Sequence, residues 1–152
     1  MGDVPRDIAH ITDIGDGGCK SDKFERDARL LEEGLAQEPE NERYFFYMAN
    51  TLACQGKIEE ARDFYRKRIE AGGWAEEIWY SMYQLAKHAP DLIEAELWVQ
   101  RAQEVTDRTE ALSWLVEQLR QKGDHFKAWH YLRAAAAMAP PGEGRLLSLI
   151  HI

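Results

Sequence analysis

The sequence EEIWYSMYQLAKHAPDLIEAELWVQRAQEV, residues 76–105, contains two helical patterns of apolar residues on either side of a proline. A proline disfavours helical geometry in the residue before it, so the first helix is predicted to stop at about His88. The second helix is predicted over Leu92–Val105, where apolar residues recur every three or four positions. Because the connection is only a few residues long, the two helices are expected to lie antiparallel and form a hairpin.

The same pattern recurs on both sides of this hairpin at a nearly fixed period. Ala61, Ala95 and Ala128 are spaced 34 and 33 residues apart. Sixteen residues before each alanine, and four residues after it, stands a large apolar side chain; these are Phe45, Trp79 and Leu112, and Tyr65, Val99 and Leu132. Such a period is typical of a helix–turn–helix solenoid. Since packed helix axes lie about 8–10 Å apart, a small residue is expected where each pair comes closest.

The remaining sequence provides the other helices of the stack. Glycines are common just past helix ends, and Gly56 and Gly123 mark two turns between paired helices. Further helices are predicted over Arg43–Gln55, Ile58–Ala71, Thr109–Lys122 and 124–139, after an unpaired helix with the apolar stripe Phe24, Ala28, Leu31 and Leu35. We therefore expect an all-α helical-hairpin solenoid of about seven helices over residues 21–141. A short irregular segment, residues 1–20, precedes it, and an unstructured tail, residues 142–152, follows.

Size and composition favour one globular domain. The chain has 152 residues, of which 45% are hydrophobic and 30% charged. Its formal net charge of −8 disfavours a nucleic-acid partner, which needs a basic surface to displace counterions from phosphates. No apolar run approaches the roughly 20 residues of a membrane span. Cys19 and Cys54 are far apart in sequence and are expected to be reduced thiols of a cytoplasmic protein.

Two sets of side chains on the predicted helices have different expected roles. Aromatic residues on the apolar stripes are expected in the core; they are Phe45, Tyr65, Trp79, Trp98, Trp114 and Trp129. A second set, on the first helix of each pair, is expected to face the concave side of the stack and bind a partner; it consists of Phe46, Asn50, Tyr80, Gln84, Ser113 and Glu117. Aromatic faces beside amides suit a peptide, or a sugar stacked on a ring. A partly covered groove without a ligand is the alternative.

The N-terminal segment contains a possible metal ligand. His10, Asp13 and Asp16 place an imidazole and two carboxylates close together in sequence, and these ligand types suit a divalent metal. His10 is the candidate ligand. The alternative is a histidine at a strand end, followed by two turn-forming aspartates. The neighbouring run 15–21 has the glycines and lysine of a phosphate-binding loop but lacks the required spacing, which favours a junction.

The repeating pattern resembles tetratricopeptide repeats. The matching features are the three alanines, Gly56 and Gly123 between paired helices, and Pro39 and Pro140 after helix ends. Arg68 departs from the family pattern, which has a small residue there, and Pro90 replaces a turn glycine. Members of the family that clamp acidic peptide tails use a lysine and an asparagine on the first helix. Here Asn50 matches the asparagine, but Phe46 takes the place of the lysine.

A narrower resemblance extends over His10–Pro141. HITDIGDGGCKSDKFERDARLLEEGLAQEPENERYFFYMANTL (residues 10–52) and YRKRIEAGGWAEEIWYSMY (residues 65–83) resemble bacterial family-2 glycosyltransferases with a helical-repeat region behind the catalytic domain. The resemblance implies a parent enzyme that transfers a glycosyl group from a nucleotide sugar to an acceptor hydroxyl, with a divalent metal held near a D-x-D motif. No such motif or domain precedes the repeats here, so no cofactor and no catalytic residue is expected in this chain itself.

Two hypotheses about function follow. In the first, the chain is the helical-repeat portion of a family-2-type glycosyltransferase, non-catalytic by itself, and packs against the upstream catalytic domain. Residues 1–20 would then be a linker to that domain or a remnant of it. LSLIHI, at Leu147–Ile152, is what a transposon end used in sequencing adapters encodes, and one interpretation is an artefact of an incomplete gene. In the second hypothesis the chain is a stand-alone tetratricopeptide adaptor that binds a peptide in its concave groove.

Overall fold

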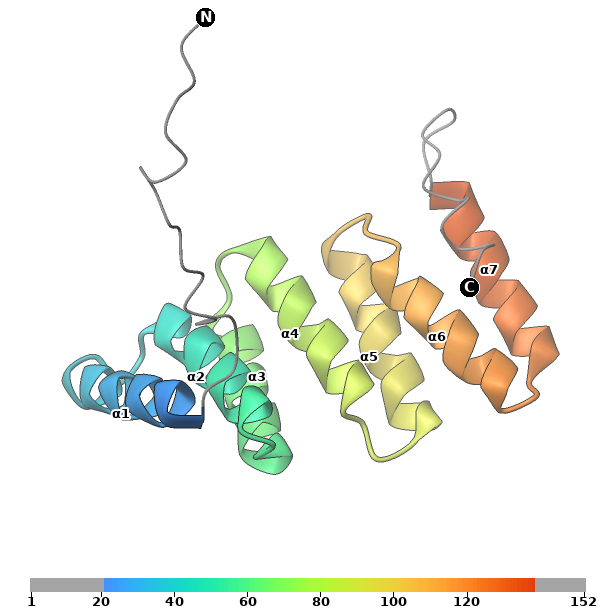
Figure 1. Cartoon of the computed structure of the whole chain (residues 1–152). Helices are drawn as coiled ribbons and strands as arrows, with labels where there is room; N and C mark the ends of the chain where they lie inside the picture. Colours follow the sequence, from blue (N-terminus) through green and yellow to red (C-terminus); the bar gives the residue numbers. More distant parts are fainter. Residues whose placement is uncertain (1–20, 139–152) are drawn as a thin grey trace, which may run out of the picture.

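A computed structural model describes residues 21–138, and the regular structure in this range consists of seven α-helices without a strand (Figure 1). The helices are α1 (Ser21–Gln37), α2 (Glu42–Cys54), α3 (Ile58–Ala71), α4 (Ala75–Lys87), α5 (Leu92–Val105), α6 (Glu110–Gln121) and α7 (His125–Met138). The predicted all-α helical-hairpin solenoid is therefore confirmed. The N-terminal segment with His10, and the C-terminal tail, lie outside the described residues.

The helices form three antiparallel hairpins that lie side by side, α2 with α3, α4 with α5 and α6 with α7 (Figure 1). Each helix contacts the next one along the chain, and α1 packs against α2 at one end of the stack. In the view of Figure 1, α2, α4 and α6 lie in front of α3 and α5. We call α2, α4 and α6 the first helices, and α3, α5 and α7 the second helices, of their hairpins.

The connections between helices show why these residues end one helix and begin the next. Gly56 and Gly123 follow α2 and α6 with φ angles of +76° and +80°, a backbone conformation that costs glycine little. The side chain of Asn41 accepts hydrogen bonds from two backbone N–H groups at the start of α2. The Asp91 and Asp124 carboxylates accept one each at the starts of α5 and α7. These turns bring consecutive helices into antiparallel contact.

The three repeated alanines lie in the seams as predicted. Ala61, Ala95 and Ala128 are 0, 2 and 4% exposed. Tyr65 and Val99, four residues after the first two alanines, are also buried, at 1 and 0%. Two clusters of buried apolar residues fill the stack, one centred on α2 and α3 and the other on α4 to α7.

The last helix departs from the prediction for the core. Trp129, expected in the core, is 54% exposed, and Leu132, expected to fill space beside Ala128, is 39% exposed. That part of the prediction is wrong because no described helix covers this side of α7. Among the other five aromatic residues predicted for the core, Tyr65 and Trp79 are buried and the rest are half-buried.

An ion pair fixes the seam between the first two hairpins. Arg68 and Glu77 are both buried, and the Arg68 Nε donates to Glu77 Oε2 at 2.8 Å. The other guanidinium nitrogens of Arg68 donate to the backbone carbonyls of Gly72 and Trp74. Arg43, from α2, approaches the second carboxylate oxygen of Glu77 at 4.0 Å. Arg68 thus ties α3 to the loop that follows it and to α4.

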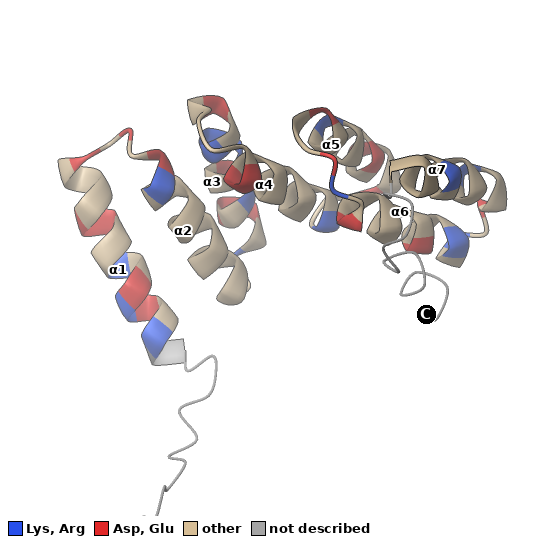
Figure 2. Cartoon of the chain, turned by 90° about the horizontal axis from the view of Figure 1, so that it is seen from above, with Lys and Arg blue, Asp and Glu red and all other residues tan. Residues whose placement is uncertain are grey.

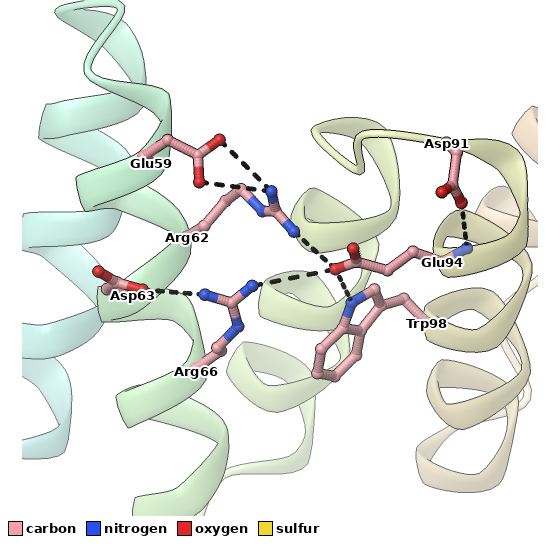
Figure 3. A network of polar contacts seen from close by, with 7 residues as sticks. All are labelled: Glu59, Arg62, Asp63, Arg66, Asp91, Glu94 and Trp98. Atoms are coloured by element: carbon pink, nitrogen blue, oxygen red, sulfur yellow. Dashed lines mark hydrogen bonds and ion pairs between the residues drawn. The ribbon is translucent and has the colours of Figure 1, made fainter.

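Second helices are joined by further polar networks. Figure 3 shows Glu94 of α5 between three donors: Arg62 Nη2 donates to its Oε1 at 2.6 Å and the Trp98 indole at 3.0 Å, while Arg66 lies at 3.9 Å. One hairpin further on, Glu96 of α5 accepts hydrogen bonds from Lys127 and Tyr131 of α7. The same type of contact therefore recurs at successive seams.

Candidate functional site

Aromatic side chains of α2 and α4 form a continuous surface, which we call the α2–α4 face. Phe46 makes edge contacts with both Tyr47 and Tyr80, at centroid distances of 5.7 and 5.6 Å. The Arg43 guanidinium lies 6.0 Å from the centre of the Tyr47 ring and donates a hydrogen bond to the Tyr47 hydroxyl at 3.3 Å. Tyr47 is 45% exposed and Phe46 and Tyr80 are half-buried, so all three offer surface to a partner.

A second group of aromatic side chains leads from α4 to α6. Tyr83 contacts Trp79 at 5.4 Å and Trp114 of α6 at 6.3 Å between ring centroids. Lys87 lies 5.5 Å from the centre of the Tyr83 ring. Burial raises the pKa of Tyr83, with a further contribution from the charge of Glu110, so its hydroxyl stays neutral at pH 7. These rings extend the aromatic surface toward the third hairpin.

The centre of the α2–α4 face carries no charge. Residues 44–56 and residues 78–86 contain no Lys, Arg, Asp or Glu, and the middle parts of α2 and α4 are tan, without blue or red, in Figure 2. The charges lie at the ends, with Arg43 at the start of α2 and Lys87 at the end of α4. Uncharged rings and amides favour a neutral polypeptide or ring-bearing ligand, and the terminal cations could pair with an acid on it.

The structure places the six predicted partner-binding residues in different environments. Phe46 and Tyr80 lie together in the α2–α4 face, as described. Asn50 is half-buried, and its Oδ1 accepts a hydrogen bond from the Tyr65 hydroxyl at 2.7 Å. Gln84 is buried, at 8% exposure, so it presents little surface for a ligand. Two of these residues are thus adjacent, and the other two on α2 and α4 pack inward.

Ser113 and Glu117 bond within α6 itself. The Ser113 hydroxyl donates to the backbone carbonyl of Thr109 at 2.8 Å. The Glu117 carboxylate accepts from Gln121 at 3.0 Å and pairs with Arg120 at 3.4 Å. Both are half-buried, and neither joins the aromatic contacts of α2 and α4. The candidate site therefore centres on the first two hairpins.

Sequence reasoning missed Arg43 and Tyr47, the most exposed members of the α2–α4 face. A signal was present, since Arg43 and Phe46 precede Glu77 and Tyr80 by the same 34 residues. Residues one repeat apart on neighbouring first helices lie side by side, as the contacts of both pairs show. For these two pairs, the repeat period predicts the contact across the seam.

The metal-ligand prediction lies outside the described residues, because His10, Asp13 and Asp16 are in the N-terminal segment. Within residues 21–138 no three His, Cys, Asp or Glu side chains gather in a way that could hold a metal ion. Cys54 is exposed and forms no disulfide. Over the same range, no helix has the length and apolar character needed to span a membrane.

The fold and the α2–α4 face together define a helical-hairpin solenoid with an exposed aromatic surface on its first helices. Comparison with known proteins adds no family to this description: neither a protein-family model nor a curated protein matches the chain.

Proposed function

We propose that the chain is a non-catalytic interaction module that holds a partner polypeptide on the α2–α4 face. The observation that carries this proposal is the contact of Phe46 with Tyr47 on one helix and Tyr80 on the next, beside the exposed Arg43. A few residues supply most of the binding energy in protein interfaces, and Trp, Tyr and Arg are enriched among them. Rings already held by one another lose little conformational freedom on binding, which favours affinity.

The parent protein that fits this module is a cytoplasmic family-2-type glycosyltransferase, on the resemblance of residues 10–141. In that setting the partner is the upstream catalytic domain of the same protein or its acceptor. The metal and the nucleotide sugar are bound by that domain. A stand-alone adaptor that binds a peptide is the second candidate, and the aromatic face supports it equally.

The nucleotide sequence upstream of Met1 separates the two candidates. A reading frame that continues in frame into a D-x-D-containing domain is expected for the transferase, whereas a stop codon in frame ahead of Met1 favours the adaptor. Nucleotide-sugar turnover by the purified 152-residue chain is expected to equal the background rate. Turnover above background would contradict a non-catalytic module.

Peptide selection tests the face itself. Peptides of 12 residues selected from a displayed library against the chain are expected to bind the Phe46→Ala and Tyr80→Ala variants at least about fivefold more weakly, which corresponds to about 1 kcal/mol. Phe126→Ala is the control, because Phe126 is 81% exposed but lies on a second helix. Circular dichroism checks that all variants remain folded. If the selected peptides bind the Phe46→Ala and Tyr80→Ala variants as tightly as the original chain, the α2–α4 face is not their binding site and the proposal is wrong.

A further inference from the structure

The outer side of α7 differs from the equivalent sides of the other second helices. Aligning the repeats on Ala61, Ala95 and Ala128 makes Leu132 equivalent to Tyr65 of α3 and Val99 of α5. Tyr65 and Val99 are 1 and 0% exposed, whereas Leu132 is 39% exposed. The following hairpin covers the first two, since Tyr65 clusters with Leu85 of α4 and Val99 with residues of α6 such as Leu112.

A second position shows the same difference. Trp129 is equivalent to Arg62 of α3 and Glu96 of α5. Arg62 is 5% exposed and bonds to Glu94 of the next hairpin, and Glu96 bonds to Lys127 of the next hairpin. Trp129 is 54% exposed. The positions of Leu132 and Trp129 are thus covered by the next hairpin in α3 and α5, whereas in α7 both are exposed to solvent.

Only some exposed residues of α7 are covered at the equivalent positions of α3 and α5; Trp129 and Leu132 are such residues. Phe126, on the same helix, is 81% exposed, but its equivalents Glu59 and Ile93 are also exposed. The position of Phe126 is therefore exposed to solvent in all three hairpins, so its exposure does not indicate a missing neighbour. Trp129, Leu132 and the exposed Ala136 define what we call the end face.

The charges around the end face indicate what would cover it. Among the seven described helices α7 alone contains no Asp or Glu. Its Lys127 pairs with Glu96 of α5, so Arg133 is the cation shown beside the end face. Arg133 lies over the Trp129 ring at 4.8 Å. Its equivalent in α3, Arg66, reaches a carboxylate oxygen of Glu94 in the next hairpin at 3.9 Å. A basic helix with an apolar stripe is complementary to an acidic one.

We propose that the end face binds an amphipathic helix of a partner protein, with small and branched apolar residues along one stripe and acidic residues beside it. The bound helix lies on the outer side of α7, as the next hairpin lies on the outer sides of α3 and α5. Its apolar stripe covers Trp129 and Leu132, and an acidic side chain pairs with Arg133. This interaction is separate from the α2–α4 face.

The probe for this proposal is a synthetic helix based on α6, which packs against α5 from the next hairpin. It has the sequence of residues 109–122 with Arg120→Glu and Lys122→Glu, and a hydrocarbon staple on the side opposite the apolar stripe keeps it helical. A second peptide differs in carrying Glu110→Lys and Glu117→Lys in place of those two changes. Binding is followed through the indole N–H signal of Trp129 in the ¹⁵N-labelled chain, assigned with Trp129→Phe.

The acidic peptide is expected to shift the Trp129 signal and to bind at least about tenfold more tightly than the basic peptide at low salt. Trp129→Glu is expected to weaken binding of the acidic peptide at least about tenfold. Phe126→Glu, the matched control on the same helix, is expected to change it less than about twofold.

Three results would overturn the proposal. The first is an unshifted Trp129 signal at millimolar concentrations of acidic peptide whose helicity has been verified. The second is equal binding of the two peptides. The third is a dimer of the chain, detected by sedimentation, that Trp129→Glu converts to a monomer, since a second copy would then occupy the end face.

Discussion

At the scale of single residues, Arg68 is the most deeply buried charged side chain among the described residues, at 0% exposure. A buried guanidinium loses its hydration, and it is tolerated only when its hydrogen-bond donors find acceptors. The Glu77 carboxylate and the carbonyls of Gly72 and Trp74 supply them. These acceptors come from the end of α3, the following loop and α4, so the bonds of one side chain orient the second hairpin relative to the first.

Removing the carboxylate should therefore be costly. Glu77→Ala is expected to lower the free energy of unfolding by about 3–5 kcal/mol, because it leaves a buried charge without its partner. Urea denaturation measures the loss. Glu76→Ala is the control; Glu76 pairs with Arg108 at the surface, and a loss below about 1 kcal/mol is expected. The double variant Arg68→Met/Glu77→Leu should regain most of the stability, and equal costs for Glu76→Ala and Glu77→Ala would contradict this account.

Glu94 should make the stability of the chain depend on pH. The hydrogen bond from the Trp98 indole, together with Arg62 and Arg66, holds the pKa of Glu94 below its ordinary value. A lowered carboxyl pKa adds stability that is fully present above the unfolded-state pKa, about 4.3, and is lost as pH falls through the folded-state value. Glu94→Gln should thus reduce the free energy of unfolding at pH 7.

The difference in unfolding free energy between Glu94→Gln and the original chain is expected to shrink as the pH falls below about 4.3. Urea denaturation at several pH values between 7 and 3 measures it. Glu104→Gln, which removes an exposed carboxylate from the same helix, is the control and should change stability little at any pH. A difference for Glu94→Gln that stays constant down to pH 3 would exclude this role.

At the scale of helices, close approach depends on small residues in matching places. Ala61, Ala95 and Ala128 are buried at the same register of the three second helices. Gly34 has a similar role between α1 and α2, because a Cβ atom at Gly34 would lie 3.0 Å from the Tyr44 ring. Residues without bulk therefore set the distance between neighbouring helices along the stack.

Enlarging one of these residues should disturb the seam. Ala95→Leu is expected to destabilise the chain by about 1–3 kcal/mol, because the buried site has no space for three more carbon atoms. Thermal unfolding measures the effect. Ala36→Leu makes the same change at an exposed position of α1 and is expected to stay within about 0.5 kcal/mol of the original. Equal stability of both variants would show that Ala95 does not limit the approach of the helices.

At the scale of the whole molecule, the stack has two unequal ends. A hairpin in a solenoid is stabilised by its neighbours on both sides, so the end elements have fewer stabilising contacts. In α1, Ala28 is the one buried residue among the side chains that the structure describes. The α4–α5 hairpin, in contrast, has buried residues along both helices and polar contacts to both neighbouring hairpins.

Local unfolding should be easiest in the end helices, which have the fewest buried contacts, and hardest in the central hairpin. Amide hydrogen exchange, measured by mass spectrometry on the full chain, is expected to be fastest in α1 and slowest in α4 and α5, with α7 between them. The expected difference between α1 and α4 is at least about tenfold in protection. Uniform protection from α1 to α7 would mean that the stack opens as one cooperative unit, contrary to this expectation.

The hairpins and their register could be predicted from the amino-acid sequence alone. Helix periodicity, turn residues such as Gly56 and the alanine period act over short distances along the chain, and these are the signals a single sequence carries. The same signals placed Phe46 and Tyr80 in the predicted partner-binding set, and the structure shows that their rings are in contact. The pairing of Arg68 inside the seam and the exposure of Trp129 became apparent only in the folded chain. Both outcomes depend on which helix lies next to the residue in space, and a helix pattern does not contain that information.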